Sequence, residues 1–254
     1  DYALSRDFTV NLYLEDWSSG MRDSRDYLFT MMDELVKLPI KRFLLPDTLG
    51  ILNPLQCVEY MRQMVRRYPN SHFDFHAHND YDLAVSNSLA AVLSGAKGLH
   101  VTVNGLGERC GNAPFASVQV ILKDMFEAKT NIKEDRLNDI SRLVEGYSGI
   151  AVAPNTPVVG DNVFTQVAGV HADGDNKDKL YCNDLVPERF GRHREYALGK
   201  NSGKANIIQN LNELGLELTP EQTKAVTKRI TELGDRKELV TQDDLPYIVS
   251  DVLK

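Results

Sequence analysis

Two histidines separated by one residue are the side chains in this sequence best suited to hold a metal ion. His76 and His78 alternate with the apolar residues Phe73, Phe75 and Ala77. In an extended strand, residues two apart point to the same side, so both imidazoles would project together while the apolar residues face the other way. Imidazole nitrogens are common ligands of divalent metals. The pattern therefore predicts a cation site at the end of a strand, with two ordinary core or surface histidines as the alternative.

Other reactive side chains stand near the ends of neighbouring apolar runs. Tyr13 and Glu15 share one face of the first run, which strand alternation directs towards the same mouth as the histidines. Glu15 could equally be a solvated strand end or part of an ion pair. Thr48 offers a hydroxyl after the second run, although a threonine following aspartate often caps a turn. Cys110 has no base beside it in sequence, so we interpret it as a structural thiol. His171 lies in a glycine-rich segment.

The elements that must position these residues form a regular succession. Strands are predicted at 8–14, 42–45, 73–80 and 98–103, and helices at 25–37, from 54, at 84–93 and at 114–125. Strands that alternate with helices predict a parallel sheet covered by helices. Polar residues at the strand ends suit either a doubly wound sheet or a (βα)8 barrel, of which four units are half.

The pattern changes after residue 128, and four parts are predicted. Residues 1–128 carry the β-α units, 129–159 a helix and linker, 160–201 a small mixed subdomain, and 202–254 a helical subdomain. Helices are expected at 135–147, 205–214, 219–234 and 243–253. The last two follow Thr219 and Thr241, which are suited to cap a helix start.

Composition narrows the class of protein. The 254 residues are 42% hydrophobic and 26% charged, with a net charge of −7, which argues against a nucleic-acid-binding surface. Cys57, Cys110 and Cys182 show no paired spacing, so we expect reduced thiols in a cytoplasmic protein. Because no apolar run approaches the length of a membrane span, no membrane partner is expected.

Longer motifs resemble the family of 2-isopropylmalate, citramalate and homocitrate synthases. His-Ala-His-Asn-Asp at 76–80 is followed by Asn-Gly-Leu-Gly-Glu-Arg-Cys-Gly-Asn at 104–112. Segments 158–160, 169–174 and 198–204 also look like that family's post-barrel subdomains, in the expected order. The resemblance spans essentially the whole chain. It implies an α/β fold made of the C-terminal half of a (βα)8 TIM barrel, strands five to eight, followed by a small mixed and a helical subdomain.

The resemblance also implies an activity and a metal site. Members of this family are metal-dependent enzymes that condense acetyl-CoA with a 2-oxo acid. With 2-oxoisovalerate or pyruvate, the products would be 2-isopropylmalate or citramalate plus CoA, in branched-chain amino-acid biosynthesis. His76 and His78 match two metal ligands, and Asn112 matches a residue at or near the metal. Nitrogen and oxygen ligands suit Zn, Mn or Mg, so ligand type does not choose among them.

The same resemblance assigns residues around the substrates. Tyr13 and Glu15 match positions that border the oxo-acid pocket, and Thr48 matches a contact to the oxo-acid carboxylate. Glu15 and a histidine of the other subunit, His171, are the candidate bases that remove a methyl proton from acetyl-CoA. The enolate would attack the keto carbon, and hydrolysis of the thioester would release CoA. Because Tyr13 is bulky, it favours the smaller substrate pyruvate. A difference of one methylene in a pocket discriminates between substrates by only about 1–3 kcal/mol.

One segment is implied to cross between subunits. His171 matches a histidine that reaches the active site of the partner, and Asp173, a substrate-binding candidate, and Tyr181, a catalytic candidate, would lie on the same segment. The resemblance therefore implies a homodimer whose active site is completed across subunits.

The sequence departs from the family at the first barrel strand. The family's Arg-Asp-Gly motif, whose aspartate is a third metal ligand, is not found. Either residues precede Asp1 in the protein, or the chain is a half-barrel fragment; alone it is expected to bind metal weakly and show negligible synthase activity. Feedback inhibition is not assumed, since a sensing domain is also lacking. The alternatives are a hydroxymethylglutaryl-CoA-lyase-like enzyme, whose loop differs from residues 108–112, and a non-catalytic dimerisation or regulatory fragment.

Overall fold

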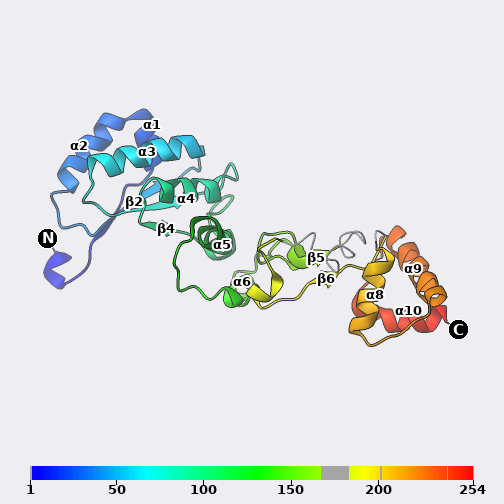
Figure 1. Cartoon of the computed structure of the whole chain (residues 1–254). Helices are drawn as coiled ribbons and strands as arrows, with labels where there is room; N and C mark the ends of the chain where they lie inside the picture. The colour runs from blue at the N-terminus through cyan, green and yellow to red at the C-terminus, as the bar shows by residue number, and fades with distance from the viewer. Residues whose placement is uncertain (1, 167–182, 201, 239, 254) are drawn as a thin grey trace. The chain divides into compact units, whose positions relative to one another are not determined.

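The structure is a computed structural model that describes residues 2–166, 183–200, 202–238 and 240–253 (Figure 1). The chain divides into two compact units. The first unit comprises Asp1–Ile132 with Asp139–Ala151, and the second comprises Lys133–Asn138 with Val152–Lys254. The four-part division expected from the sequence is finer than this and stays a prediction.

The first unit is built on a parallel sheet whose strands lie in chain order. The strands are β1 (Asn11–Tyr13), β2 (Arg42–Asp47), β3 (Phe73–Ala77) and β4 (Gly98–His100). Their connections contain α1 (Trp17–Asp23), α2 (Arg25–Leu35), α3 (Pro54–Arg67) and α4 (Ala84–Leu93). Parallel crossovers are right-handed, so a strand order that never reverses leaves every connecting helix on one face (Figure 1). A doubly wound sheet has helices on both faces. The arrangement is therefore that of a barrel fragment.

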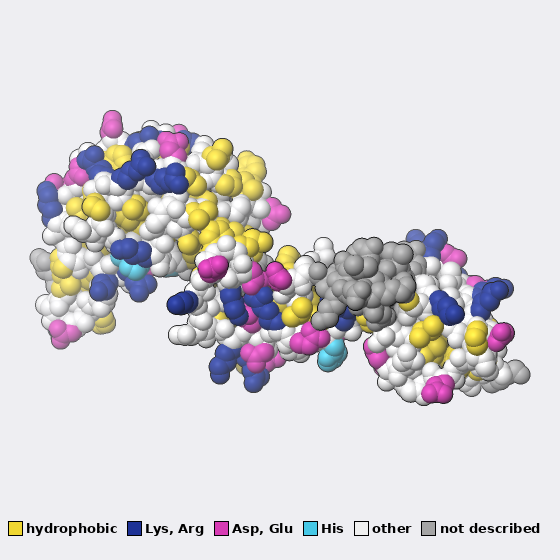
Figure 2. Space-filling model, viewed as in Figure 1, with side chains coloured by type: hydrophobic (Ala, Val, Ile, Leu, Met, Phe, Trp, Pro, Cys, Tyr) yellow, Lys and Arg dark blue, Asp and Glu magenta, His cyan; other side chains and the backbone are white. Residues whose placement is uncertain are grey.

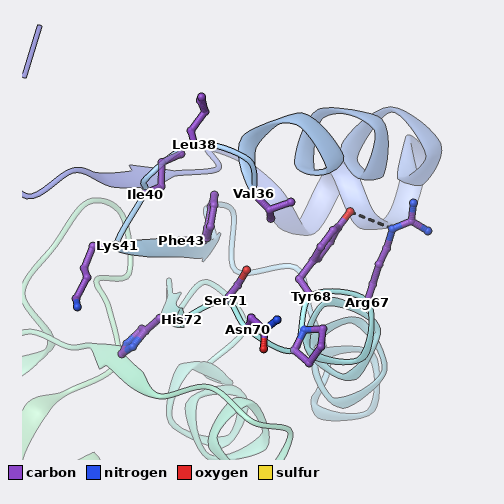
Figure 3. A pocket seen from close by; sticks show the side chains of 11 residues that line it. Val36, Leu38, Ile40, Lys41, Phe43, Arg67, Tyr68, Asn70, Ser71 and His72 are labelled. Atoms are coloured by element: carbon purple, nitrogen blue, oxygen red, sulfur yellow. Dashed lines mark hydrogen bonds between the residues drawn. The ribbon is translucent and has the colours of Figure 1, made fainter. Parts of the chain in front are cut away.

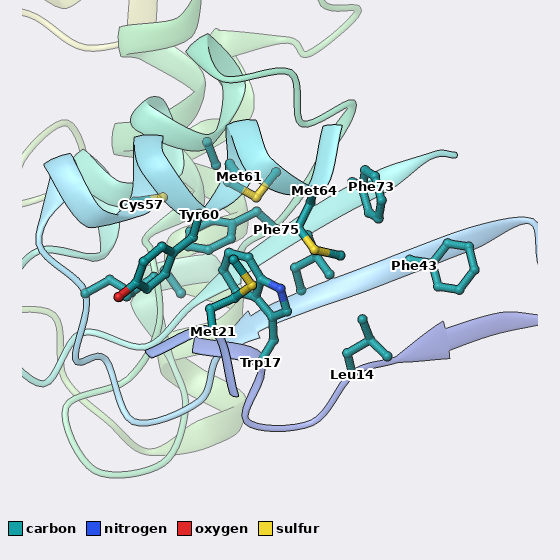
Figure 4. Packing of buried hydrophobic residues seen from close by; sticks show 14 of the residues in the cluster. Leu14, Trp17, Met21, Phe43, Cys57, Tyr60, Met61, Met64, Phe73 and Phe75 are labelled. Carbon is teal, nitrogen blue, oxygen red and sulfur yellow. The ribbon is translucent and has the colours of Figure 1, made fainter. Parts of the chain in front are cut away.

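The core lies between the sheet and these helices (Figure 4). Trp17 is fully buried, and its ring meets those of Tyr60 and Phe75 edge-on, each at a centroid distance of 6.3 Å. Phe73 and Ala77 are buried on the same side as Phe75, as the alternation predicted. Because this side of β3 is used by the core, the intervening side chains must face away from the helices.

The opposite side of the sheet, which we call the inner face, is largely polar. Tyr13 is in register with Leu44, Leu44 with Asp74, and His76 with His100. Residues in register across parallel strands point to the same side. The inner face therefore carries the functional candidates of the strands, whereas the helix-facing side is apolar.

Several predicted boundaries change. β1 and β4 are shorter than expected, and the chain after β4 turns into a 3₁₀ helix, η2 (Val103–Gly105), where Asn104 takes a φ of 59°. Helix α1 was not predicted, because Ser18, Ser19 and Gly20 are weak helix formers. Burial of Trp17 and its neighbours supplies the stabilisation that helix propensity does not. The unit continues with α5 (Phe115–Phe126) and α6 (Leu137–Ser148), the latter starting in the second unit's segment.

The second unit contains a two-stranded sheet and a helical part. β5 (Thr165–Gln166) pairs in parallel with β6 (Glu195–Tyr196), next to 3₁₀ helices η3 (Glu134–Arg136), η4 (Asp161–Phe164) and η5 (Pro187–Phe190). Helices α8 (Lys204–Glu213), α9 (Pro220–Asp235) and α10 (Leu245–Val252), with η6 (Gln242–Asp244), enclose a separate apolar cluster. Thr219 caps α9 through a capping box with Gln222, as its position predicted, and Thr241 makes the corresponding box with Asp244.

Surface charges are mixed. On the face that Figure 2 shows, basic and acidic side chains are interspersed over both units rather than gathered by sign. Of the helices in the described part of the chain, none is long and apolar enough to cross a membrane.

Candidate metal and substrate site

His76 and His78 lie at the carboxyl end of β3, as expected from the sequence. Their ring centroids are 5.1 Å apart and the ring planes are nearly perpendicular. The Nδ1 atom of His76 lies 3.4 Å from the backbone oxygen of His100. Burial lowers the pKa of His76, and the neighbouring imidazoles lower it further. A lowered pKa favours the neutral imidazole, which is the form that binds a metal.

Asn112 lies beside the two histidines because the following loop folds back onto the end of β3. His78 and Asn112 form an isolated antiparallel bridge, and the Asn79 amide donates to the Gly111 carbonyl at 2.9 Å. The Asn112 side-chain amide donates to the Leu106 carbonyl at 3.0 Å. This hydrogen bond engages the amide nitrogen of Asn112 and leaves the amide oxygen as the atom that can accept a hydrogen bond or bind a metal.

Two buried polar atoms at this place, Nδ1 of His78 and Oδ1 of Asn112, have no hydrogen-bond partner among the described residues. Other buried atoms of the described residues, such as Trp17 Nε1 and Thr102 Oγ1, also have no partner there, so the two are distinguished by lying at the strand end that carries His76. An imidazole nitrogen and an amide oxygen are both suitable metal donors. The site therefore fits a divalent cation.

Glycines allow the loop 104–112 to fold this tightly. Gly111 has a φ of 81°, and a Cβ on it would collide with the Gly105 carbonyl. A Cβ on Gly107 would collide with the Asn112 amide. At the start of the loop, Asn104 exchanges hydrogen bonds with Ser141, at 2.9 Å and 2.6 Å. The glycine-rich motif is thus required by packing around Asn112.

An ion pair joins this loop to the two neighbouring strand ends. Arg109 donates to both carboxylate oxygens of Asp80, at 2.7 and 3.0 Å, and also to the Thr48 carbonyl at 2.8 Å. These hydrogen bonds hold the pKa of Asp80 below its usual value. Because the contact is bidentate, it fixes the orientation of the three loops as well as their distance.

Glu15 and Thr48 meet at the ends of β1 and β2. The Thr48 hydroxyl donates to Oε1 of Glu15 at 2.9 Å and accepts from the Asp16 amide at 3.1 Å. Thr48 therefore links two strands instead of only capping its own turn. Glu15 is exposed, so its carboxylate is accessible at the same end of the sheet as the histidines.

The loop after β2 is held by a buried carboxylate. Asp47 accepts from the backbone amides of Ile51 and Leu52, at 3.0 and 3.1 Å. Burial raises the pKa of Asp47, which these hydrogen bonds partly offset. In the same loop Gly50 has a φ of 60°, and a Cβ on it would crowd the His78 carbonyl oxygen and the Asp80 amide, each at 3.0 Å. The position of Thr48 thus depends on Asp47.

The structure adds two residues that sequence reasoning missed. His100 Nδ1 lies 2.6 Å from the hydroxyl of Tyr13, and His100 Nε2 lies 3.5 Å from the carboxylate of Asp74. The parity of their strands could have placed both residues on the inner face. Nothing in the sequence indicated that Tyr13 and His100 would meet, because the two residues are 87 positions apart.

Three candidates and one cysteine lie outside the described residues. His171, Asp173 and Tyr181 are among them, so the crossing segment stays a prediction, as does Cys182. Cys110 is exposed, and its interpretation as a structural thiol stays a prediction. In the described ranges, no three side chains of the types His, Cys, Asp and Glu gather as a metal site. The candidate donors are therefore His76 and His78, with Asn112 beside them.

A separate cavity of about 580 Å³ lies at the other end of the strands (Figure 3). Lys41, Phe43 and His72, which line it, stand at or just before the starts of β2 and β3. Parallel α/β folds bind substrates at the carboxyl ends of their strands. The cavity is therefore not the candidate site.

Comparisons with known proteins agree with the fold and with the motifs. A family model described as HMGL-like matches residues 3–144, and one described as homocitrate synthase post-HMGL domain-like matches residues 158–238. A Methanopyrus kandleri protein carrying the (R)-citramalate synthase name CimA is 37% identical over 256 residues, covering 100% of this chain and 49% of the relative. A Methanocaldococcus jannaschii protein named 2-isopropylmalate synthase is 37% identical over 257 residues, with the same coverages. The resemblance inferred from the motifs is confirmed.

The similarity to these relatives covers only part of their length. The chain spans about half the length of the curated relatives it matches. Among solved structures, the Bacillus subtilis HMG-CoA lyase has a TM-score of 0.54 at 23% identity, covering 59% of this chain and 53% of the lyase. At this identity the likeness concerns the fold alone, and it confirms the predicted α/β barrel fragment.

Proposed function

The chain belongs to the HMGL-like family, and from this premise we propose that the protein condenses acetyl-CoA with a short 2-oxo acid in a reaction that depends on a divalent metal. The relatives' names as citramalate and 2-isopropylmalate synthases support this reaction. The observation that carries the proposal is the pair of buried atoms on His78 and Asn112, near His76, for which the described part of the chain provides no hydrogen-bond partner.

In this chain, His76, His78 and Asn112 are the residues that would hold the proposed metal. Their nitrogen and oxygen donors suit Zn, Mn or Mg. A bound cation supplies Lewis-acid polarisation of a substrate carbonyl.

The remaining groups bind and orient the substrates. The proposed role of the Thr48 hydroxyl, which donates to Glu15 at the strand ends, is to donate to the carboxylate of the oxo acid. Glu15, which is exposed at the strand ends, is the proposed base for the methyl proton of acetyl-CoA. Loss of that proton gives an enolate, whose carbon attacks the keto carbon of the oxo acid, and water then cleaves the thioester to CoA and the new acid. Arg109, which pairs with Asp80 and donates to the Thr48 carbonyl, keeps the loop 104–112 together with the ends of β2 and β3.

The substrate and the partner are further parts of the proposal. Tyr13, a bulky side chain on the inner face, favours pyruvate over 2-oxoisovalerate, and so a citramalate synthase of branched-chain amino-acid biosynthesis. A homodimer in the cytoplasm, with His171, Asp173 and Tyr181 reaching the partner's site, follows from the family resemblance.

Release of the CoA thiol from acetyl-CoA by the complete protein tests the proposal. We expect release that requires both a divalent metal and a 2-oxo acid, with pyruvate used better than 2-oxoisovalerate or 2-oxoglutarate. A matched reaction with hydroxymethylglutaryl-CoA tests the lyase alternative. Cleavage of that thioester, without condensation of any 2-oxo acid, would overturn the proposal. His76→Ala is the inactive control.

A further inference from the structure

Tyr13 and His100 touch although they belong to the two outer strands of the sheet. β1 and β4 are separated by β2 and β3. On a flat sheet, three strand spacings would place them roughly 14 Å apart. The observed 2.6 Å between the Tyr13 hydroxyl and His100 Nδ1 therefore requires a strongly curved sheet, with the phenol reaching across its inner face.

The contacts of His100 determine which atom donates. Its Nε2 faces the carboxylate of Asp74 at 3.5 Å, so the imidazole proton belongs on Nε2 and Nδ1 is the acceptor. Partial burial, together with the negative charges of Glu15 and Asp74, raises the pKa of Tyr13, so the phenol keeps its proton. The Tyr13 hydroxyl donates to Nδ1, and the two rings meet edge-on at 5.7 Å.

Asp74 provides a fixed support for His100. Its side chain is only 2% exposed and contacts His72 at 2.8 Å and Arg42 at 3.4 Å. On β4, Gly98 lies in register with Asp74, and a Cβ on Gly98 would collide with the carboxylate. The missing side chain at Gly98 leaves the space that Asp74 occupies. His100 therefore contacts the buried Asp74 carboxylate through Nε2, while its Nδ1 meets the Tyr13 hydroxyl.

The position of Tyr13 depends on this contact because the residue is 49% exposed. A tyrosine so exposed would otherwise sample several rotamers. His76, a proposed metal ligand, neighbours His100 at a centroid distance of 6.3 Å, so the bridged ring lies beside the proposed metal site. The placement of the Tyr13 ring can thus decide which substrate side chains fit.

We propose that His100 is a positioning residue, which holds the Tyr13 ring across the inner face so that the ring excludes 2-oxo acids with branched side chains. The inference rests on the proposed condensation and identifies what sets its substrate class. One additional methylene in a pocket changes selectivity by roughly 10- to 200-fold. Freeing the ring should therefore reduce the preference for pyruvate over 2-oxoisovalerate by about one order of magnitude or more.

The test compares kcat/KM for pyruvate and for 2-oxoisovalerate in variants of the complete protein. Tyr13→Phe keeps the ring but removes the hydrogen bond, and His100→Ala removes the acceptor. Each should lower the selectivity ratio about tenfold or more, and the double variant should lower it no further, because both single changes break one contact. His100→Asn, whose side-chain oxygen can replace Nδ1, should retain most of the ratio. His193→Ala, an exposed histidine of the second unit, is the matched control.

Several results would overturn the inference. A wild-type ratio in Tyr13→Phe, or effects of the two single variants that multiply in the double variant, would show that the hydrogen bond does not set selectivity. Tyr13→Phe decides the matter even where His100→Ala does not fold. Wild-type protein that releases no thiol with any 2-oxo acid would refute the proposed function and the inference together. An active wild type with unchanged ratios in the variants refutes only the inference.

Discussion

Replacing Asp47 with alanine should destabilise the first unit and displace the loop that carries Thr48. The carboxylate is fully buried at the end of β2 and accepts hydrogen bonds from the amides of Ile51 and Leu52. Leu52 is 1% exposed, so water cannot replace its lost partner. Ile51 is half-buried, so its amide can regain part of its hydration.

The size of the effect follows from these two amides. A buried donor left without a partner costs about 1–3 kcal/mol. The full cost applies to Leu52 and a fraction of it to Ile51, whereas removing a poorly solvated carboxylate offsets some of the loss. We therefore expect Asp47→Ala to lower the free energy of unfolding by about 2–3 kcal/mol. Asp47→Asn keeps one acceptor oxygen, so its effect should be intermediate.

Urea unfolding followed by tryptophan fluorescence measures this change. Trp17 is the one tryptophan of the 254-residue chain and is fully buried in the first unit, so the signal reports on that unit. The unfolding midpoint should fall without a change in slope. Asp26→Ala, an exposed aspartate in the first turn of α2, is the control, with a loss below about 1 kcal/mol. If Asp47→Ala unfolds at the control's midpoint, the carboxylate does not hold the loop.

Three further predictions concern the site and the core edge. His78→Ala should weaken Mn²⁺ binding, measured by calorimetry, by more than about tenfold while the urea midpoint stays near that of the wild type; unchanged affinity would exclude His78 as a ligand. Arg109→Lys should lower kcat/KM for the condensation because a lysine cannot make the bidentate contact to Asp80, and a wild-type value would show that the pair is dispensable. Burial and the hydrogen bond to Asp33 raise the pKa of Tyr68 to about 12. The neutral phenol stabilises the fold fully at pH values below the pKa of tyrosine in the unfolded chain, near 10, and this stabilisation is lost as the pH rises through 12. Stability against urea should therefore fall over this interval, and Tyr68→Phe should make the fall less steep. Equal slopes for the variant and the wild type would contradict the assignment.

The sequence predicted the elements whose signals are local. Apolar residues alternating with His76 and His78 placed β3 and its two faces correctly, and the threonine caps placed the starts of α9 and η6. The short helix after Asp16 escaped prediction because its Ser-Ser-Gly stretch has low helix propensity, and only the burial of Trp17 stabilises it.

Contacts between distant strands could not be predicted in the same way. The Tyr13–His100 bridge depends on the curvature of the sheet, which no run of residues encodes by itself. The support from Asp74 depends on the absence of a side chain at Gly98, in the neighbouring strand. The motif 104–112 was recognised as a unit, but only the structure assigns its arginine to Asp80 and its glycines to packing around Asn112.

Deuterium labelling of the product tests whether the protein joins the acetyl methyl carbon to the oxo acid. The complete protein would be incubated with a divalent metal, pyruvate and acetyl-CoA whose methyl group carries three deuterons, and the acids formed would be analysed by mass spectrometry. Because a base must remove one methyl deuteron before the new carbon–carbon bond forms, we expect a branched hydroxy diacid that retains two deuterons. Release of CoA accompanied only by acetate with all three deuterons would contradict it.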